Sequence, residues 1–211
     1  MSDSRIQPIT GKAATALVIF DVASLGFISL GFEMVASRIL TPLFGGTIYT
    51  WATIISIVVA GLMVGYFVGG LVADRFPSFR VAAAVKLAAA AYLGLVFLLA
   101  DGSLEALANS VSGDIAALFV CGVVVCFAPM VVMGMYSPLS VRLLLRRAGD
   151  AGKISGGLFA ISSLGNIAGI IVTTFVLIPS IGTRAITGGF AAFLAISGLV
   201  SLAAYLSRQT E

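Results

Sequence analysis

The chain has 211 residues, of which 60% are hydrophobic and only 10% are charged, and its mean hydropathy is +1.14. This composition excludes an ordinary soluble domain, whose surface needs many more charged side chains. The formal charge is +3 and histidine is absent, which argues against a metalloenzyme or a Ser-His-Asp hydrolase. We therefore expect an all-α integral membrane protein with no enzyme activity, no metal and no cofactor.

Apolar segments recur along the whole chain and set the number of membrane crossings. A bilayer core of about 30 Å needs roughly 20 apolar residues per helix, so the chain has room for about six. We predict a single membrane domain over residues 1–211, without a soluble enzyme domain, and a loop at the acidic stretch 101–114. In chain order, the predicted helices cover about 14–40, 49–72, 81–100, 115–136, 154–178 and 185–206.

Lysine and arginine in the short connections predict the orientation of the helices. The third connection is acidic, whereas the second and fourth are basic, and basic loops usually face the cytoplasm. We therefore place both ends of the chain in the cytoplasm and expect the basic residues to mark topology rather than a nucleic-acid partner. The basic residues of the two connections are Arg75, Arg80, Arg142, Arg146, Arg147 and Lys153.

The first predicted helix carries Glu33 well inside its apolar run, where a carboxylate facing lipid would cost several kcal/mol. Gly26, Ser29 and Ser37 lie on the same helical stripe, so this stripe must face protein or a water-filled cavity. Two interpretations remain open. Glu33 pairs with Arg38 or with a donor at a helix end and locks the bundle, or it binds a cation or a proton.

Three other residues within the apolar runs are interpreted as structural. Asp21 lies nearer the cytoplasmic end of the first helix and points away from the Glu33 stripe, which predicts an interfacial position. Cys121 and Cys126 are five positions apart on one helix, so they cannot form a local disulfide, and we expect them to pack in the interior.

The fifth predicted helix has a polar stripe along its whole length. Such a stripe lines either a helix interface or a cavity. Asn166, near its middle, is the residue that we expect to touch a ligand, with interhelical hydrogen bonding as the alternative. The stripe follows a spacing of four and three residues through Ser155, Phe159, Ser162, Asn166, Gly169 and Thr173.

Glycines four residues apart occur in the second and fifth predicted helices. Glycine at this spacing lets two helix backbones approach closely, which predicts packing rather than chemistry. We expect these helices to contact each other, within one chain or between two chains. The glycines are Gly61, Gly65 and Gly69 in the second helix and Gly165 and Gly169 in the fifth.

The end of the second helix carries Asp74 and Arg75, followed by Arg80. A glycine, an Asp-Arg pair and a further basic residue resemble the loop between helices 2 and 3 of the major facilitator superfamily, although Pro77 and Phe79 depart from that pattern. The resemblance implies a cytoplasmic latch between helix ends, made by these three residues together with Arg142.

Longer blocks of the sequence look like the membrane part of the fused transporter/spermidine-synthase family. The resemblance covers most of residues 25–185 and implies half of a major facilitator fold, with two inverted three-helix repeats. Neither the glycine-rich nucleotide loop nor the paired acids of the synthase are present, so no synthase activity is implied. The resembling blocks are 33–45, Trp51, 65–75, 137–143, 157–165 and 175–184.

Two functions follow as hypotheses. In the first, the chain is a half-size transporter in a bacterial cytoplasmic membrane, acting as a homodimer on a small cationic solute such as a polyamine. Glu33, Arg38, Ser29, Ser162 and Asn166 would then line the ligand site. In the second, it is a non-transporting scaffold that anchors or feeds a separately encoded, spermidine-synthase-like enzyme through the basic cytoplasmic loop between the fourth and fifth helices.

Overall fold

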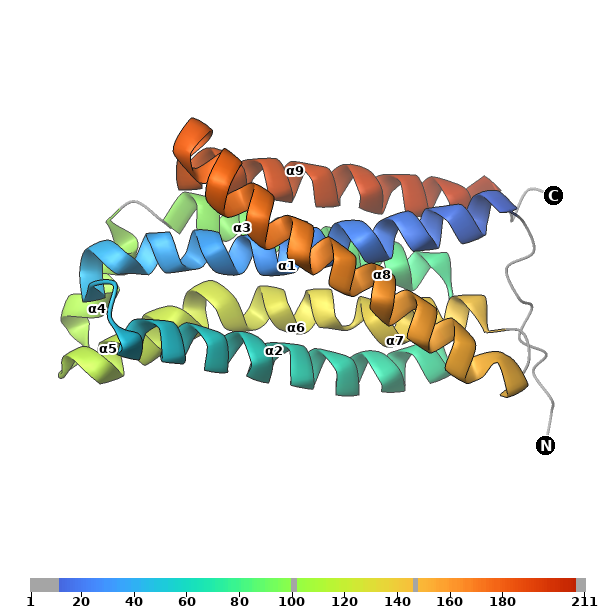
Figure 1. The fold of residues 1–211 in the computed structure, drawn as a ribbon, viewed down its shortest axis with the longest axis horizontal. Coiled ribbons are helices and arrows are strands. Elements are labelled where there is room, and N and C mark those ends of the chain that lie inside the picture. Colours follow the sequence, from blue (N-terminus) through green and yellow to red (C-terminus); the bar gives the residue numbers. More distant parts are fainter. Residues whose placement is uncertain (1–11, 100–101, 146–147, 208–211) are drawn as a thin grey trace.

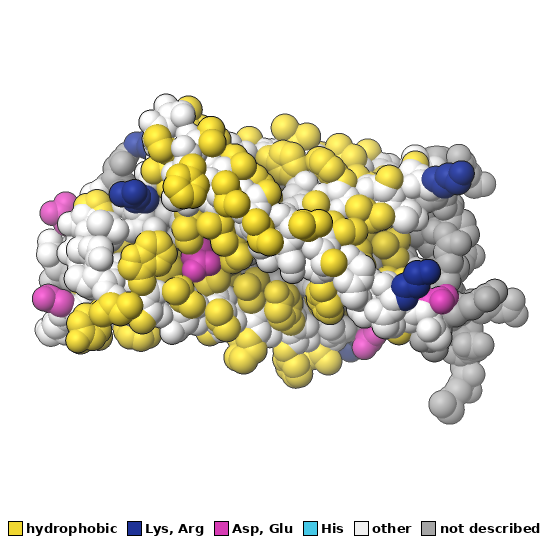
Figure 2. Space-filling view, in the orientation of Figure 1, with side chains coloured by type: hydrophobic (Ala, Val, Ile, Leu, Met, Phe, Trp, Pro, Cys, Tyr) yellow, Lys and Arg dark blue, Asp and Glu magenta, His cyan; other side chains and the backbone are white. Residues whose placement is uncertain are grey.

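The computed structural model describes residues 12–99, 102–145 and 148–207, and this part of the chain contains helices and no strand. Five helical stretches in it are long and apolar enough to cross a membrane. Figure 2 shows the corresponding belt of hydrophobic side chains, with lysine and arginine gathered at both ends of the molecule. The protein is therefore an all-α, multi-pass membrane protein.

The first three stretches lie close to the predicted helices, whereas the fourth continues eight residues past its predicted end, to Leu144. The third predicted connection is not simply a loop, because it contains the short helix α4, whose Leu104 is buried against the bundle. The fourth stretch is built from four helical segments in succession. The stretches are α1 (Lys12–Phe44), α2 (Ile48–Arg75), α3 (Phe79–Leu99) and, after α4 (Ser103–Ser110), the run of α5 (Asp114–Gly122), η1 (Val123–Phe127), α6 (Ala128–Gly134) and α7 (Tyr136–Leu144).

The last stretch, Ala151–Ser207, follows the short turn η2 (Ala148–Asp150) and has 57 residues, which as a straight helix would be roughly 85 Å long. It is not straight, because Gly182 has φ 76° and ψ 162°, a conformation open essentially only to glycine. Figure 1 shows α8 running obliquely across α1 and α9 returning toward the end where α8 begins. Its segments are α8 (Ala151–Val172), η3 (Thr173–Leu177) and α9 (Ile178–Ser207).

The helices pack as three main pairs: α3 with α9, α1 with α8, and α2 with α6 and α7. The glycines explain two of these pairs. A Cβ on Gly165 or Gly169 would lie 2.2 Å or 2.1 Å from a backbone oxygen of α1, and a Cβ on Gly65 would lie 2.3 Å from the backbone oxygen of Val131 in α6. The expected contact between the second and fifth helices is therefore replaced by two separate glycine contacts, each with another helix of the same chain.

Two π-helical turns, η1 and η3, each end two residues before a proline, Pro129 or Pro179. Proline lacks the N–H that would continue the ladder, and its ring crowds the preceding turn, so a wider turn relieves both problems. Near Pro129, the Tyr92 hydroxyl donates a hydrogen bond to the carbonyl of Val124 at 2.8 Å. The helix thus passes Pro129 through a widened turn, and the Val124 carbonyl in this turn accepts a hydrogen bond from another helix.

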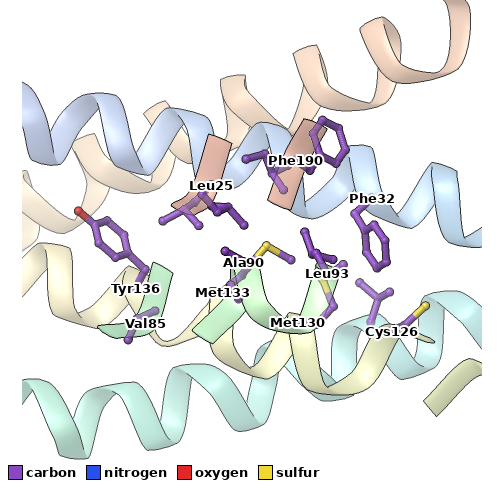
Figure 3. Close-up of a cluster of buried hydrophobic side chains, with 14 of the residues drawn as sticks. Leu25, Phe32, Val85, Ala90, Leu93, Cys126, Met130, Met133, Tyr136 and Phe190 are labelled. Atoms are coloured by element: carbon purple, nitrogen blue, oxygen red, sulfur yellow. The ribbon is translucent and has the colours of Figure 1, made fainter. Parts of the chain in front are cut away.

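The apolar core lies between α1, α3, α6 and α9. Figure 3 shows Phe32, Leu93 and Met130 in this core, and Tyr136 at its edge with the hydroxyl pointing away from the apolar side chains. Cys121 and Cys126 are buried and free, as expected for packing residues. At the edge of the core, the Tyr136 hydroxyl belongs to a set of buried polar side chains, and this set forms the candidate site.

Candidate functional site

A lysine and an aspartate form an ion pair inside the helix bundle. Lys86 of α3 has no exposed side-chain surface and Asp21 of α1 is 1% exposed. The ammonium group of Lys86 donates to Asp21 Oδ2 at 2.6 Å, to Ser201 Oγ at 2.6 Å and to Ser197 Oγ at 3.0 Å. Three acceptors thus match the three protons of the ammonium group.

The carboxylate of Asp21 is bonded equally completely. Its Oδ2 also accepts a hydrogen bond from the Tyr136 hydroxyl of α7 at 2.8 Å, and its Oδ1 accepts one from Ser197 Oγ at 2.7 Å. Buried charges persist only when they are paired and hydrogen-bonded. We call Asp21, Lys86, Tyr136, Ser197 and Ser201 the Asp21 cluster.

Four helices bring the Asp21 cluster together at one depth. Asp21 lies nine residues after the start of α1, Lys86 seven after the start of α3, and Ser201 six before the end of α9. At 1.5 Å per residue, these positions are roughly 9–14 Å inside the same end of the bundle. Ser197 and Ser201 are one turn apart on α9, so both hydroxyls face the same side. The cluster therefore joins α1 to the α3–α9 pair within the apolar belt.

The sequence interpretation missed this cluster. Asp21 is not interfacial, because it is buried against a counter-charge on another helix. Lys86 is the one charged residue between Val81 and Leu99, so an ammonium group facing lipid there would be as unfavourable as the carboxylate of Glu33. A lone lysine and a lone aspartate in separate spans were the available signal for a pair.

A small polar cavity adjoins the cluster on the side of Tyr136. It has a volume of about 50 Å³, which is room for a few water molecules, and lies between α1, α2, α6, α7 and α8. Its apolar walls come from leucines, a valine and a methionine. Its polar lining consists of Ser29, Tyr66, Tyr136, Ser137, Ser140, Ser162 and Asn166.

The structure brings Ser29, Ser162 and Asn166 together at this cavity, as the ligand-site hypothesis requires. Ser29 donates to the sulfur of Met130 at 3.4 Å. The side chains of Ser162 and Asn166 make no hydrogen bond in the described residues, and both are half-buried. The polar stripe of α8 therefore keeps free donors and acceptors on the cavity side.

Glu33 and Arg38 do not join this cavity or each other. Glu33 is 8% exposed, Arg38 is exposed, and no ion pair links them in the described residues. Glu33 is therefore a second buried carboxylate, separate from the Asp21 cluster and without a counter-charge in the described part of the chain.

Two of the four expected latch residues lie together. Asp74 Oδ1, at the end of α2, is 3.6 Å from Arg142 Nε in α7. Asp74 is 77% exposed, so the pair contributes little to stability. Arg75 stacks on the ring of Phe76 instead, with 5.7 Å from its guanidinium carbon to the ring centre, and Arg80 is exposed.

Comparison with family models, with curated proteins and with solved structures found no match. The resemblance to the fused transporter/spermidine-synthase family thus stays a prediction. No group of three or more histidine, cysteine, aspartate or glutamate side chains in the described residues could hold a metal ion. The candidate site consists of the Asp21 cluster, the adjoining cavity and the separate carboxylate of Glu33.

Proposed function

We propose that this chain is a half-size membrane transporter that acts as a homodimer on a small cationic solute such as a polyamine. One observation carries the proposal: the face formed by α1, α2, α7 and α8 holds a polar cavity whose Ser162 and Asn166 have no hydrogen-bond partner in the described residues. Lipid cannot satisfy such groups, but water or a solute between two copies can.

The packing of the helices supports a repeat of three helices. Counting the segments on either side of Gly182 separately gives six crossings, with α5 to α7 as the fourth, α8 as the fifth and α9 as the sixth. If the chain contains two repeats, the first crossing corresponds to the fourth, the second to the fifth and the third to the sixth. The contact of α1 with α8 then corresponds to the contact of α6–α7 with α2, and the contact of α3 with α9 corresponds to itself. This is the pattern expected of two inverted repeats.

The proposed orientation has both ends in the cytoplasm. Figure 1 shows that α1 begins and α9 ends at the same end of the bundle, as an even number of crossings requires. The connection between α2 and α3 lies at that end too, and it carries Arg75 and Arg80, which favours the cytoplasmic side. Asp74 and Arg142 would then form a contact between helix ends at the cytoplasmic mouth.

Two features support a cationic solute and a second copy. Glu33 supplies a carboxylate without a counter-charge in the described residues, and a carboxylate in a low-dielectric site favours a cation. A cavity of about 50 Å³ is too small for a polyamine, so a second copy must provide the opposite wall of any pathway.

The proposal is tested by uptake of radiolabelled spermidine into liposomes that contain the purified protein. We expect uptake by the wild type and by Glu105→Gln, which changes an exposed carboxylate outside the long helices, but not by Glu33→Gln. Elution of all three proteins as the same folded species would exclude a folding defect. Absence of uptake by the wild type, with or without a proton gradient, would contradict transport of this solute and favour the scaffold.

A further inference from the structure

We propose that Asp21 is a proton-binding site, reached from the cavity through Tyr136, and that its protonation releases Lys86 and loosens the junction between α1 and the α3–α9 pair. The proton would then be the coupling ion, a role that rests on the proposed transport function. The binding site itself rests only on the geometry of the Asp21 cluster and the cavity.

Tyr136 provides the connection between water and carboxylate. Its side chain lines the cavity, and its hydroxyl donates to Asp21 Oδ2 at 2.8 Å. A phenolic oxygen both donates and accepts hydrogen bonds, so it can accept one from cavity water. In the transfer, a proton from hydrated cavity water binds the Tyr136 oxygen while the phenolic proton passes to Asp21 Oδ2. Tyrosine remains neutral, Asp21 becomes a neutral acid, and the cavity loses one proton.

Protonation changes the balance of charge around Lys86. In the structure, Asp21 Oδ2 is its only charged acceptor among the described residues, and the other two acceptors are the hydroxyls of Ser197 and Ser201. An ammonium group without a counter-charge is strongly disfavoured in a low-dielectric interior. Lys86 therefore moves toward water at the near end of the bundle, with its flexible stem following apolar surface. Its helix, α3, packs on α9, so both would separate from α1 at this level.

Few other ionisable groups in the described residues face Asp21. Lys86 on α3 and Tyr136 on α7 contact it, and α9 contributes the two serines, with Tyr205 one turn beyond them. Tyr66 of α2 also lines the cavity, and it makes no hydrogen bond to Asp21 in the described residues. Glu33 lies twelve residues away on α1, roughly 18 Å along the axis, and the Asp74–Arg142 pair and Lys153 of α8 lie at the end of the bundle.

The test is an infrared titration of the purified protein in lipid vesicles, without any solute. The carbonyl band of a protonated carboxylic acid is absent from a carboxylate, so it reports proton binding directly. We expect a carboxylic acid band to appear as the pH is lowered, to persist in Glu33→Gln and to be lost in Asp21→Asn. Lys86→Met removes the counter-charge, so its Asp21 holds a proton at neutral pH and gives the reference band.

The relay is tested by following the same band after a rapid drop in pH. Tyr136→Phe removes the hydroxyl but keeps the ring, and we expect the band to rise at least about tenfold more slowly. Tyr66→Phe, which removes a cavity hydroxyl that does not touch Asp21, should keep the wild-type rate. An unchanged rate in Tyr136→Phe would overturn the route.

No Asp21 band at any pH at which the protein stays folded would overturn the proton site and leave a purely structural ion pair. The outcome is separate from that of the transport assay. An Asp21 band without spermidine uptake would retain the proton site and contradict the proposed substrate. Uptake without the band would retain the transporter and remove the proton site.

Discussion

At the scale of single residues, the Asp21 cluster shows how a charge is kept inside an apolar bundle. Each proton of the Lys86 ammonium group has an acceptor, and both oxygens of Asp21 have donors. In such a site the cost of desolvation is offset only while both charges are present. Removing either partner leaves the other as an uncompensated buried ion or forces it to become neutral, and both outcomes cost free energy.

We therefore predict that Lys86→Met lowers the free energy of unfolding by about 3–5 kcal/mol, because Asp21 loses its counter-charge. The double variant Asp21→Asn/Lys86→Met should recover much of this loss, since it buries no charge. Lys12→Met is the matched control, because Lys12 is exposed at the start of α1. Unfolding in mixed micelles with increasing SDS measures the wild type, these three variants and the single variant Asp21→Asn. A double variant as unstable as the sum of both single variants would contradict the pairing.

Residue-level prediction from the sequence was uneven for a physical reason. A carboxylate in the middle of an apolar run is unusual on its own, so Glu33 could be singled out from one helix. Asp21 and Lys86 are explained only as an ion pair, and 65 positions of chain separate them. A hydropathy profile scores each residue from its own segment and cannot indicate a partner on another helix. The sequence therefore predicts an interfacial Asp21 and gives no role to Lys86.

At the scale of helices, glycine decides which backbones approach. Gly165 and Gly169 of α8 lie against α1, and Gly61, Gly65 and Gly69 of α2 lie against α6 and the residue that follows it, Met135. The sequence predicts close packing at these residues, and in the structure a Cβ at any of them would lie within 3 Å of a neighbouring segment. The spacing could not identify the partner helix, because any helix with small residues at the right level can fill the same groove.

Glycines on one helix provide a matched comparison. Gly165→Ala would place a Cβ 2.2 Å from the backbone oxygen of Ala23, so α1 and α8 must separate, and we expect a loss of about 1–3 kcal/mol of stability. Gly157→Ala, two turns earlier on α8, meets nothing within 4 Å and should be neutral or slightly stabilising. Thermal unfolding in one detergent measures both. Equal melting temperatures for the two variants would contradict the close contact of α1 with α8.

At the scale of the whole molecule, composition was sufficient for the class of protein, and five long apolar helical stretches confirm it. Helix ends were less predictable. The first helix was expected to end near residue 40, but α1 continues through Pro42 to Phe44. The acidic connection contains α4 because Leu104 can pack on the bundle, a tertiary contact that hydropathy does not contain.

The central claim is that the polar face of α1, α2, α7 and α8 lines an aqueous pathway between two copies. Labelling of single cysteines with a charged, membrane-impermeant thiosulfonate tests it most directly, in a background without Cys121 and Cys126. Ser162→Cys and Asn166→Cys lie on this face, whereas Leu164→Cys is on the same helix at a residue that is 67% exposed on another side. We predict rapid labelling at 162 and 166 and almost none at 164, where lipid covers the helix. Equally slow labelling at all three positions in the folded protein would contradict the pathway.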